Sequence, residues 1–271
     1  MKLNLHQAYR LVFALSVLWL LPCRELRALT YDFNAYTLGD LHGQSGWGSE
    51  GFNGASGIQI ATGSFDSSRF ALFSDAGAGR GASAWNQGAF SALNGSEAVT
   101  LQFDFRAGTT QSNYVGLGWD NASGKVTLNS AANRHGFEIK TALSGGIAVF
   151  LNGSSFGTDS GGFTDGGWYT IRVNMDLAAN SGAGSLSVVS KVANASSFDP
   201  VTGLQNVNMG LDRLGTSASD PTLWNTLWFH NEGGFSGMDN LAVTAVPEPA
   251  PIALFTGGVI AMGMVVFRRR R

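Results

Sequence analysis

The feature that most constrains this 271-residue chain is a strict alternation of apolar and polar residues in several short segments. In residues 99–106 every odd position is apolar and every even position is polar. Side chains of a β-strand alternate between two faces, so this pattern predicts a strand with one buried and one wet face. The same pattern in a second segment places Tyr169, Ile171, Val173 and Met175 on the buried face.

The rest of the composition also favours strands joined by tight turns. The chain has 37 glycines and only 13% charged residues, about twice the usual glycine and half the usual charge of a globular protein. Asn152-Gly153 and Asp165-Gly166 are turn signals of the kind that hairpins need. Together with 99–106 and 169–176, the predicted strands are 30–36, 58–61, 69–74, 113–119, 135–142, 146–151, 185–192, 223–229 and 238–245. We therefore predict an all-β fold, a two-sheet antiparallel sandwich.

The N-terminal segment 1–29 has the plan of a secretory signal peptide. Lys2 and Arg10 precede an uninterrupted apolar run at 11–21, and a polar stretch ends near Ala28. This run is too short for a stable membrane anchor, which needs about 20 residues. Cleavage after Ala28 would also remove the single cysteine, Cys23, so the mature chain could form no disulfide. We predict export.

The C-terminal segment predicts a transmembrane helix at 250–267, which carries no charge and is followed by Arg268, Arg269, Arg270 and Arg271. Basic clusters stay on the cytoplasmic side, so the helix would hold the body of the protein outside. Pro247, Glu248 and Pro249 stand immediately before it. Residues 247–271 thus contain a Pro-Glu-Pro tripeptide, an apolar segment and an arginine cluster in that order. This arrangement resembles the PEP-CTERM sorting signal of exported bacterial proteins. The resemblance implies that an exosortase removes the apolar tail and passes the body to the cell envelope or beyond.

The body, residues 30–246, reads as one domain without a linker or repeat. It holds 9 basic and 17 acidic residues, a net charge of −8, which argues against nucleic acid as a partner. Its strand order, with the motifs 43–47, 168–173 and 238–241, resembles the concanavalin A-like, or laminin-G-like, jelly roll.

Catalysis is not expected. Glycoside hydrolases of this fold carry a Glu-x-Asp-x-Glu pattern on one strand, because a retaining mechanism needs two carboxylates about 5 Å apart. Here Glu138 is followed two positions later by Lys140, and Glu138 is interpreted as a solvent-facing strand residue. Ser155 matches a Gly-x-Ser-x-Gly pattern, but it follows a strand that ends at a turn and not one that enters a helix.

No cofactor is predicted. His42, His135 and His230 lack a second ligand at a short spacing. Calcium stays open, because some laminin-G-like domains bind it through loop carboxylates such as Asp159 and Asp165. Aromatic rings stack on sugars, and the predicted ligand site is Trp224 and Trp228 with His230 and Asn231.

The leading hypothesis is a non-enzymatic, exosortase-sorted protein of the cell envelope or extracellular matrix that binds neutral exopolysaccharide. Its partners would be the export machinery, the exosortase, and the membrane before processing. Two alternatives remain, a carbohydrate-active enzyme (glycoside hydrolase or lyase) on the same fold and a purely structural surface protein.

Overall fold

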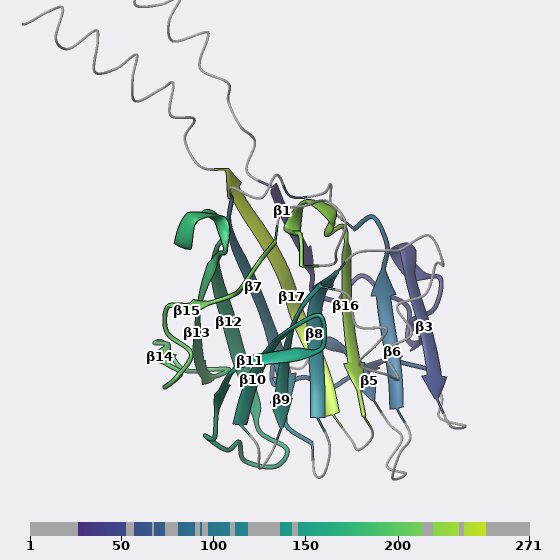
Figure 1. Cartoon of the computed structure of the whole chain (residues 1–271). Helices are drawn as coiled ribbons and strands as arrows, with labels where there is room; N and C mark the ends of the chain where they lie inside the picture. The colour runs from purple at the N-terminus through teal and green to yellow at the C-terminus, as the bar shows by residue number, and fades with distance from the viewer. Residues whose placement is uncertain are drawn as a thin grey trace, which may run out of the picture. The chain divides into compact units, whose positions relative to one another are not determined.

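Residues 27–52, 57–66, 68–73, 81–89, 93, 97–108, 112–118, 136–142, 146–212, 219–232 and 236–247 are described by a computed structural model of the chain. Of these, Arg27 to Val246 form one compact unit. Two antiparallel sheets make up the described part of this unit, together with short 3-10 turns at Gln44–Gly46, Asn180–Gly182 and Pro221–Leu223 (Figure 1). In the part of the chain that is described, no helix has the length and apolar character needed to cross a membrane.

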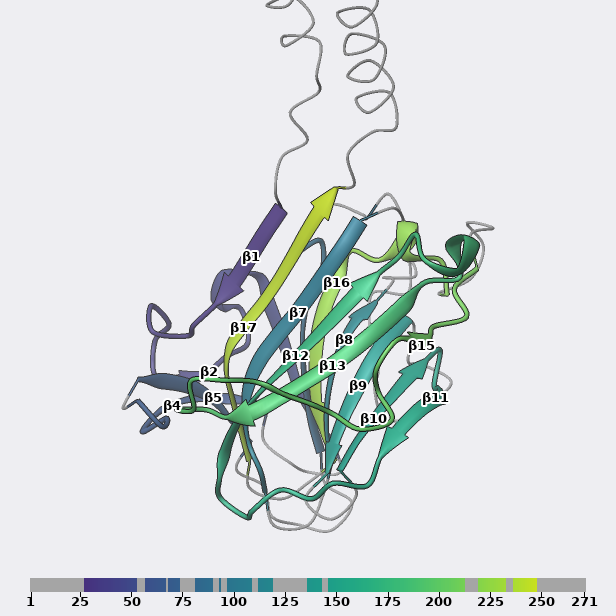
Figure 2. The ribbon, with the colours of Figure 1, turned by 90° about the vertical axis from the view of Figure 1, so that its left-hand side faces the viewer.

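The larger sheet has ten strands, with β17 near its centre. Its main path runs β14-β13-β12-β7-β17-β5-β4-β2, while β1 pairs with β17 and β15 with β13. The neighbouring strands β13, β12, β7, β17 and β1 can be followed in Figure 2. Their bounds are β1 Arg27–Tyr31, β2 Gly39–Asp40, β4 Gln59–Thr62, β5 Arg69–Phe73, β7 Glu97–Arg106, β12 Trp168–Asp176, β13 Ser185–Val192, β14 Asp199–Pro200, β15 Val207–Asn208 and β17 Ser236–Pro247.

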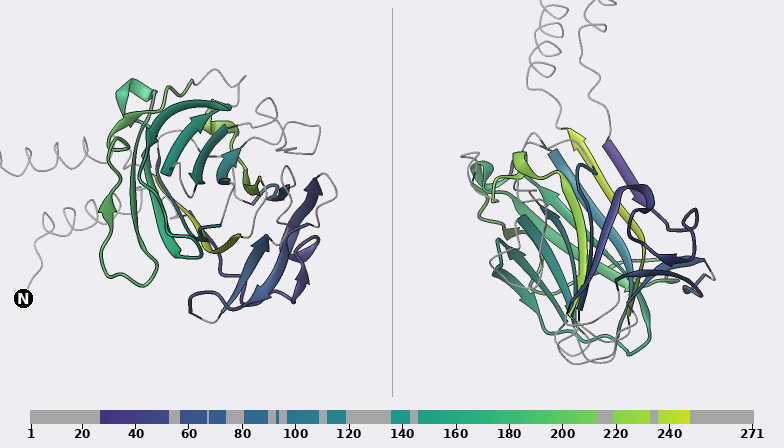
Figure 3. Two further views of the ribbon diagram at one scale, coloured as in Figure 1. Left: turned by 90° about the horizontal axis from the view of Figure 1, so that it is seen from below. Right: turned by 90° about the vertical axis from the view of Figure 1, so that its right-hand side faces the viewer.

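The smaller sheet has seven strands in the order β11-β10-β9-β8-β16-β6-β3. Strands far apart in the sequence are neighbours here, because β16 lies between β6 and β8. The bounds are β3 Trp47–Phe52, β6 Gly81–Asn86, β8 Ser112–Gly118, β9 Gly136–Ala142, β10 Gly146–Leu151, β11 Ser154–Asp159 and β16 Thr226–Asn231. Figure 3 shows this sheet stacked against the larger one.

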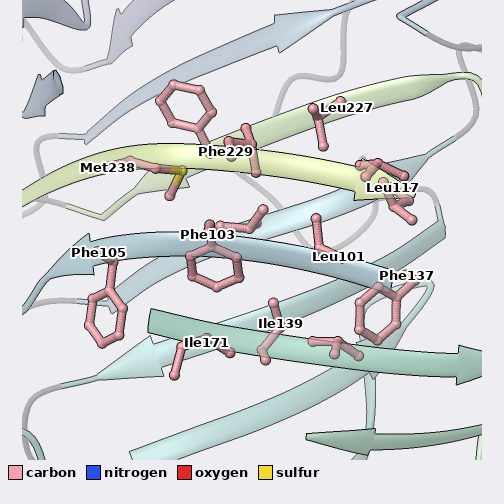
Figure 4. Packing of buried hydrophobic residues seen from close by; sticks show 14 of the residues in the cluster. Leu101, Phe103, Phe105, Leu117, Phe137, Ile139, Ile171, Leu227, Phe229 and Met238 are labelled. Carbon is pink, nitrogen blue, oxygen red and sulfur yellow. The ribbon is translucent and has the colours of Figure 1, made fainter. Parts of the chain in front are cut away.

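One hydrophobic core fills the space between the sheets. Leu101, Phe103 and Phe105 enter it from β7, and Ile171 enters from β12 (Figure 4). The seven-stranded sheet contributes Leu117, Phe137, Ile139, Leu227 and Phe229 to the same core. The inward positions predicted for 99–106 are all buried, as are Ile171, Val173 and Met175, while Tyr169 is partly buried against the same core.

The predicted all-β, two-sheet fold is confirmed. Strand β1 begins at Arg27, within the predicted signal peptide, and its pairs run from Arg27 opposite Ala245 to Tyr31 opposite Leu241. Strands β2, β3, β6, β11, β14 and β15 were not predicted. The predicted strand 223–229 begins only at Thr226, because Asp220 caps a 3-10 turn at Pro221–Leu223.

Candidate functional site

The seven-stranded sheet carries a second layer of aromatic and polar side chains on the side that faces away from the core. Along β16, Leu227 and Phe229 belong to the core, so Trp228 and His230 lie on the opposite side. Trp228 and Tyr114 form a hydrophobic cluster separate from the core, with Trp85 packed against it. We call this side the outer face and define it by Ser83, Trp85, Tyr114, Glu138, Lys140, Trp228 and His230.

One row of the outer face holds two tryptophans, a glycine and a carboxylate. Trp85 lies opposite Trp228, Trp228 opposite Gly116, and Gly116 opposite Glu138. A Cβ atom at Gly116 would come within 2.2 Å of Cζ2 of Trp228. The Trp228 indole therefore lies across Gly116, towards β9, and only glycine leaves room for it.

The other end of the same row repeats this arrangement at an edge strand. Gly48 of β3 lies opposite Trp85, and a Cβ atom at Gly48 would come within 2.5 Å of Cε2 of Trp85. Trp85 is half-buried, whereas Trp228 is buried. The indole of Trp85 is thus the aromatic surface of this row that solvent reaches.

The adjacent row is polar. Ser83 lies opposite His230, His230 opposite Tyr114, and Tyr114 opposite Lys140. The Ser83 hydroxyl and His230 Nδ1 are 2.8 Å apart, and the Lys140 ammonium lies 5.4 Å from the centre of the Tyr114 ring. The Tyr114 hydroxyl donates a 2.9 Å hydrogen bond to Glu232 Oε1. This row offers hydroxyl, imidazole and ammonium groups beside the two tryptophans.

Burial of these polar groups distinguishes the outer face from an ordinary wet face of a sheet. Ser83, Tyr114, His230 and Glu138 are all buried. The indole Nε1 of Trp228 is also buried and has no hydrogen-bond acceptor among the residues that the structure describes. A buried N–H donor without an acceptor costs about 1–3 kcal/mol, so this atom lowers the stability of the fold.

The predicted ligand site is only half on this face. Trp224 is 0% exposed and Trp228 1% exposed, so this pair is not an exposed aromatic surface. Trp224 follows the 3-10 turn and packs into the core near Phe137. Asn231 faces Asn113, whose Oδ1 accepts a 2.8 Å hydrogen bond from Asn231 Nδ2. The structure brings Trp228 and His230 together and separates them from the other two.

Glu138 requires a second correction. It lies on the same face as Lys140, as predicted, but it is 1% exposed and not solvent-facing. Trp85, Tyr114 and Ser83 were missed as site residues. The available signal was the repeated placement of glycine opposite tryptophan, which only the strand register reveals.

The sorting residues other than Pro247, namely Glu248, Pro249, Arg268, Arg269, Arg270 and Arg271, lie outside the described residues, as does the predicted helix 250–267. Pro247 is the last residue of β17.

No group of three or more histidine, aspartate or glutamate side chains that could hold a metal ion occurs among the described residues. Asp159, one of the loop carboxylates considered for calcium, accepts a long 3.4 Å hydrogen bond from the backbone N–H of Gly161.

No family model and no curated protein sequence matches this chain. Similar solved structures include the exoplasmic/lumenal domain of VIP36 in a Ca²⁺/Man3GlcNAc-bound form, at 13% identity and a TM-score of 0.46, covering 74% of this chain and 86% of that one. The potassium-bound carbohydrate recognition domain of Emp46p has 15% identity and a TM-score of 0.43, covering 74% and 88%. The calreticulin globular domain of T. cruzi has 11% identity and a TM-score of 0.45, covering 77% and 87%. These values carry no argument about function.

Proposed function

We propose that this chain is an exported, surface-sorted protein whose concanavalin A-like sandwich binds a neutral polysaccharide on the outer face of the seven-stranded sheet. The observation that carries the proposal is the row in which Trp85 and Trp228 lie across Gly48 and Gly116, beside the polar row of Ser83, His230, Tyr114 and Lys140.

This arrangement suits the chemistry of a sugar ring. The C–H face of a pyranose stacks on an indole, while its hydroxyls need donors and acceptors around the edge of the ring. Trp85 supplies the half-buried indole, and Lys140, the partly exposed member of the polar row, supplies an ammonium donor for the sugar hydroxyls. One stacked ring contributes about 1–2 kcal/mol by analogy with base stacking, so a single domain should bind with a dissociation constant nearer millimolar than nanomolar.

We propose binding without cleavage, because Lys140 stands where hydrolases of the jelly-roll fold carry a second carboxylate on the Glu138 strand. One observation favours the enzyme alternative: Tyr114 bonded to Glu232 and Ser83 bonded to His230 are acid–base pairs on one face. New reducing ends or unsaturated products from an incubated glycan would establish that alternative.

The export and sorting part of the proposal rests on Pro247-Glu248-Pro249, the apolar segment 250–267 and the four terminal arginines. It makes an exosortase the processing partner and the cell envelope or the extracellular matrix the destination. Binding of a matrix polysaccharide would then retain the sandwich at the cell surface.

The test is a calorimetric titration of the purified protein with a panel of neutral oligosaccharides. Trp85→Ala should weaken binding about tenfold, as loss of a stacking contact predicts. The matched control is Trp168→Ala, because Trp168 is a half-buried tryptophan of the ten-stranded sheet that packs on Phe65 and Phe70. Equal effects of the two substitutions, or no binding to any glycan, would remove this site and favour the purely structural alternative.

A further inference from the structure

A second polar cluster lies on the ten-stranded sheet, on the side that faces away from the core. Met238 and Leu241 of β17 enter the core, as do Phe103 and Phe105 of β7. Asp239 and Asp104 lie between these core residues and are 0% and 5% exposed. Asn240, which has a positive φ of 48°, joins them through a 2.7 Å hydrogen bond from its Nδ2 to Asp104 Oδ2.

Asp239 is also connected to the turn 63–68 between β4 and β5. Its Oδ2 lies 3.0 Å from Ser68 Oγ, which lies 2.7 Å from Ser64 Oγ. Ser64 Oγ in turn makes a short hydrogen bond with Oδ1 of Asp66, an exposed residue. The result is a chain of four oxygen atoms with three contacts between them, which runs from a fully buried carboxyl group to the surface.

If both aspartates were ionised, these four oxygen atoms would have one hydrogen fewer than their three contacts need. Each contact between two oxygens needs one hydrogen, and Ser64 and Ser68 supply one hydroxyl hydrogen each. The third must come from a carboxyl group. Asp66 is exposed and also accepts a 2.9 Å hydrogen bond from the Ser68 backbone N–H, which favours its ionised form. Asp239 is therefore the group that carries the proton.

We propose that Asp239 is a protonated carboxylic acid at neutral pH and donates to Ser68, which makes the chain Asp239–Ser68–Ser64–Asp66 a pH-sensitive tie between β17 and the turn 63–68. When Asp239 donates to Ser68, Ser68 can donate to Ser64 and Ser64 to Asp66, so each of the three contacts has its own hydrogen. Loss of the Asp239 proton leaves two hydrogens for three contacts, so one pair of oxygens must separate.

The electrostatic surroundings agree with this assignment. The pKa of Asp239 is raised to about 7, chiefly by burial and also by the charges of Asp66 and Asp104, against the backbone hydrogen bond from Asn240 and the contact with Ser68. Hydrogen bonds from Ser64 and Ser68 lower the pKa of Asp66. Burial also raises the pKa of Asp104, against hydrogen bonds from Thr170 and Asn240 and the charge of Lys191 on β13. Other cations of this region point elsewhere, since Arg69 bonds to the Tyr36 carbonyl and Arg172 to Gln102.

The sign of the pH dependence follows from the raised pKa. An unfolded aspartate titrates near 3.9, so the folded state holds this proton more tightly. The stabilising contribution is complete below about pH 4 and is lost as the pH rises through about 7. Between pH 6 and pH 8 the equilibrium constant for unfolding should rise about tenfold from this group alone.

The experiment combines infrared spectroscopy with unfolding measurements on the purified protein. The carbonyl band of a protonated carboxylic acid should be present at pH 6, titrate with a midpoint near 7, and be absent in Asp239→Asn. That variant keeps a donor to Ser68, so its stability at pH 8 should exceed that of the unmodified protein. Asp199→Asn, an exposed position on β14, is the control and should change nothing.

Ser64→Ala provides a second test that does not depend on how Asp239→Asn folds. Without Ser64, the Ser68 hydroxyl hydrogen is available to the Asp239 carboxylate, so the midpoint of the acid band should fall. A band that survives in Asp239→Asn, or a midpoint unchanged in Ser64→Ala, would overturn the proposal.

Discussion

Trp228 lies across Gly116, its neighbour on β8, so closely that a Cβ atom at position 116 would come within 2.2 Å of the indole. Gly116 is thus a packing requirement of the outer face and not a turn residue. Gly116→Ala should displace Trp228 and lower the free energy of unfolding by about 1–3 kcal/mol, as overpacking does elsewhere. Denaturant unfolding monitored by tryptophan fluorescence would measure this.

Gly161→Ala is the matched control for that substitution, because a Cβ atom there would lie 3.4 Å from the flexible Asp159 carboxylate. It should alter stability by less than about 0.5 kcal/mol. If Gly116→Ala changed stability as little as Gly161→Ala, the close packing of the Trp228 indole on Gly116 would be contradicted.

Strand β1 should be part of the folded unit and not an expendable leader. Tyr31 packs edge-on against Trp47 at 5.0 Å between ring centres, and its hydroxyl accepts a 3.0 Å hydrogen bond from Asn86. Deletion of residues 27–31 should therefore cost about 2–5 kcal/mol, comparable to loss of a large core side chain. Thermal unfolding that is unchanged by this deletion would place β1 outside the cooperative fold.

Trp47 should contribute more to stability than Trp85, because the two indoles belong to different layers. Trp47 packs on Phe33 and Phe229 in the core, and its Nε1 donates to the Tyr36 hydroxyl. Trp47→Ala should cost about 3–5 kcal/mol, whereas Trp85→Ala should mainly reduce glycan binding. Urea titrations of both variants would show the contrast, and the reverse order of stabilities would contradict the assignment of layers.

The mature protein should lack both of its ends. Intact-mass analysis of protein from the native host should show loss of a leader that ends near the start of β1, together with loss of everything after the Pro247-Glu248-Pro249 region. Pro247→Ala together with Glu248→Ala should block the C-terminal loss. If the full tail persists in the membrane and these substitutions have no effect, the segment is a plain anchor.

Alternation predicted the strands that have one apolar and one polar face, and these strands position the core. It missed β6 and β3, whose sequences Gly-Ala-Ser-Ala-Trp-Asn and Trp-Gly-Ser-Glu-Gly-Phe contain small residues and no β-branched ones. In β3, Gly48 leaves room for the indole of Trp85, and in β6, Gly81 leaves room for the backbone carbonyl of Asn231. That requirement comes from the sheet register and leaves no mark on the local sequence.

The candidate site was harder to predict for a related reason. Trp224 and Trp228 were the sequence's candidates for an exposed pair, but Trp224 directly follows the 3-10 turn at Pro221–Leu223 and precedes β16, so the two indoles do not share a face of one strand. His230 was identified from the sequence, whereas its partner Ser83 lies 147 residues away. Pairing between strands that are distant in the sequence decides which polar groups meet, and local patterns do not contain that information.

The indole N–H signals of protein labelled with ¹⁵N-tryptophan test the central claim most directly, because each tryptophan reports on its own layer. During titration with a neutral oligosaccharide, the signals of Trp85 and Trp228 should shift together, while those of Trp47 and Trp224 in the core and Trp168 on the other sheet stay in place. Substitution of each tryptophan by phenylalanine assigns the signals. Shifts confined to Trp168, or shifts of none of these signals under conditions where the glycan binds, would contradict a carbohydrate site on the outer face.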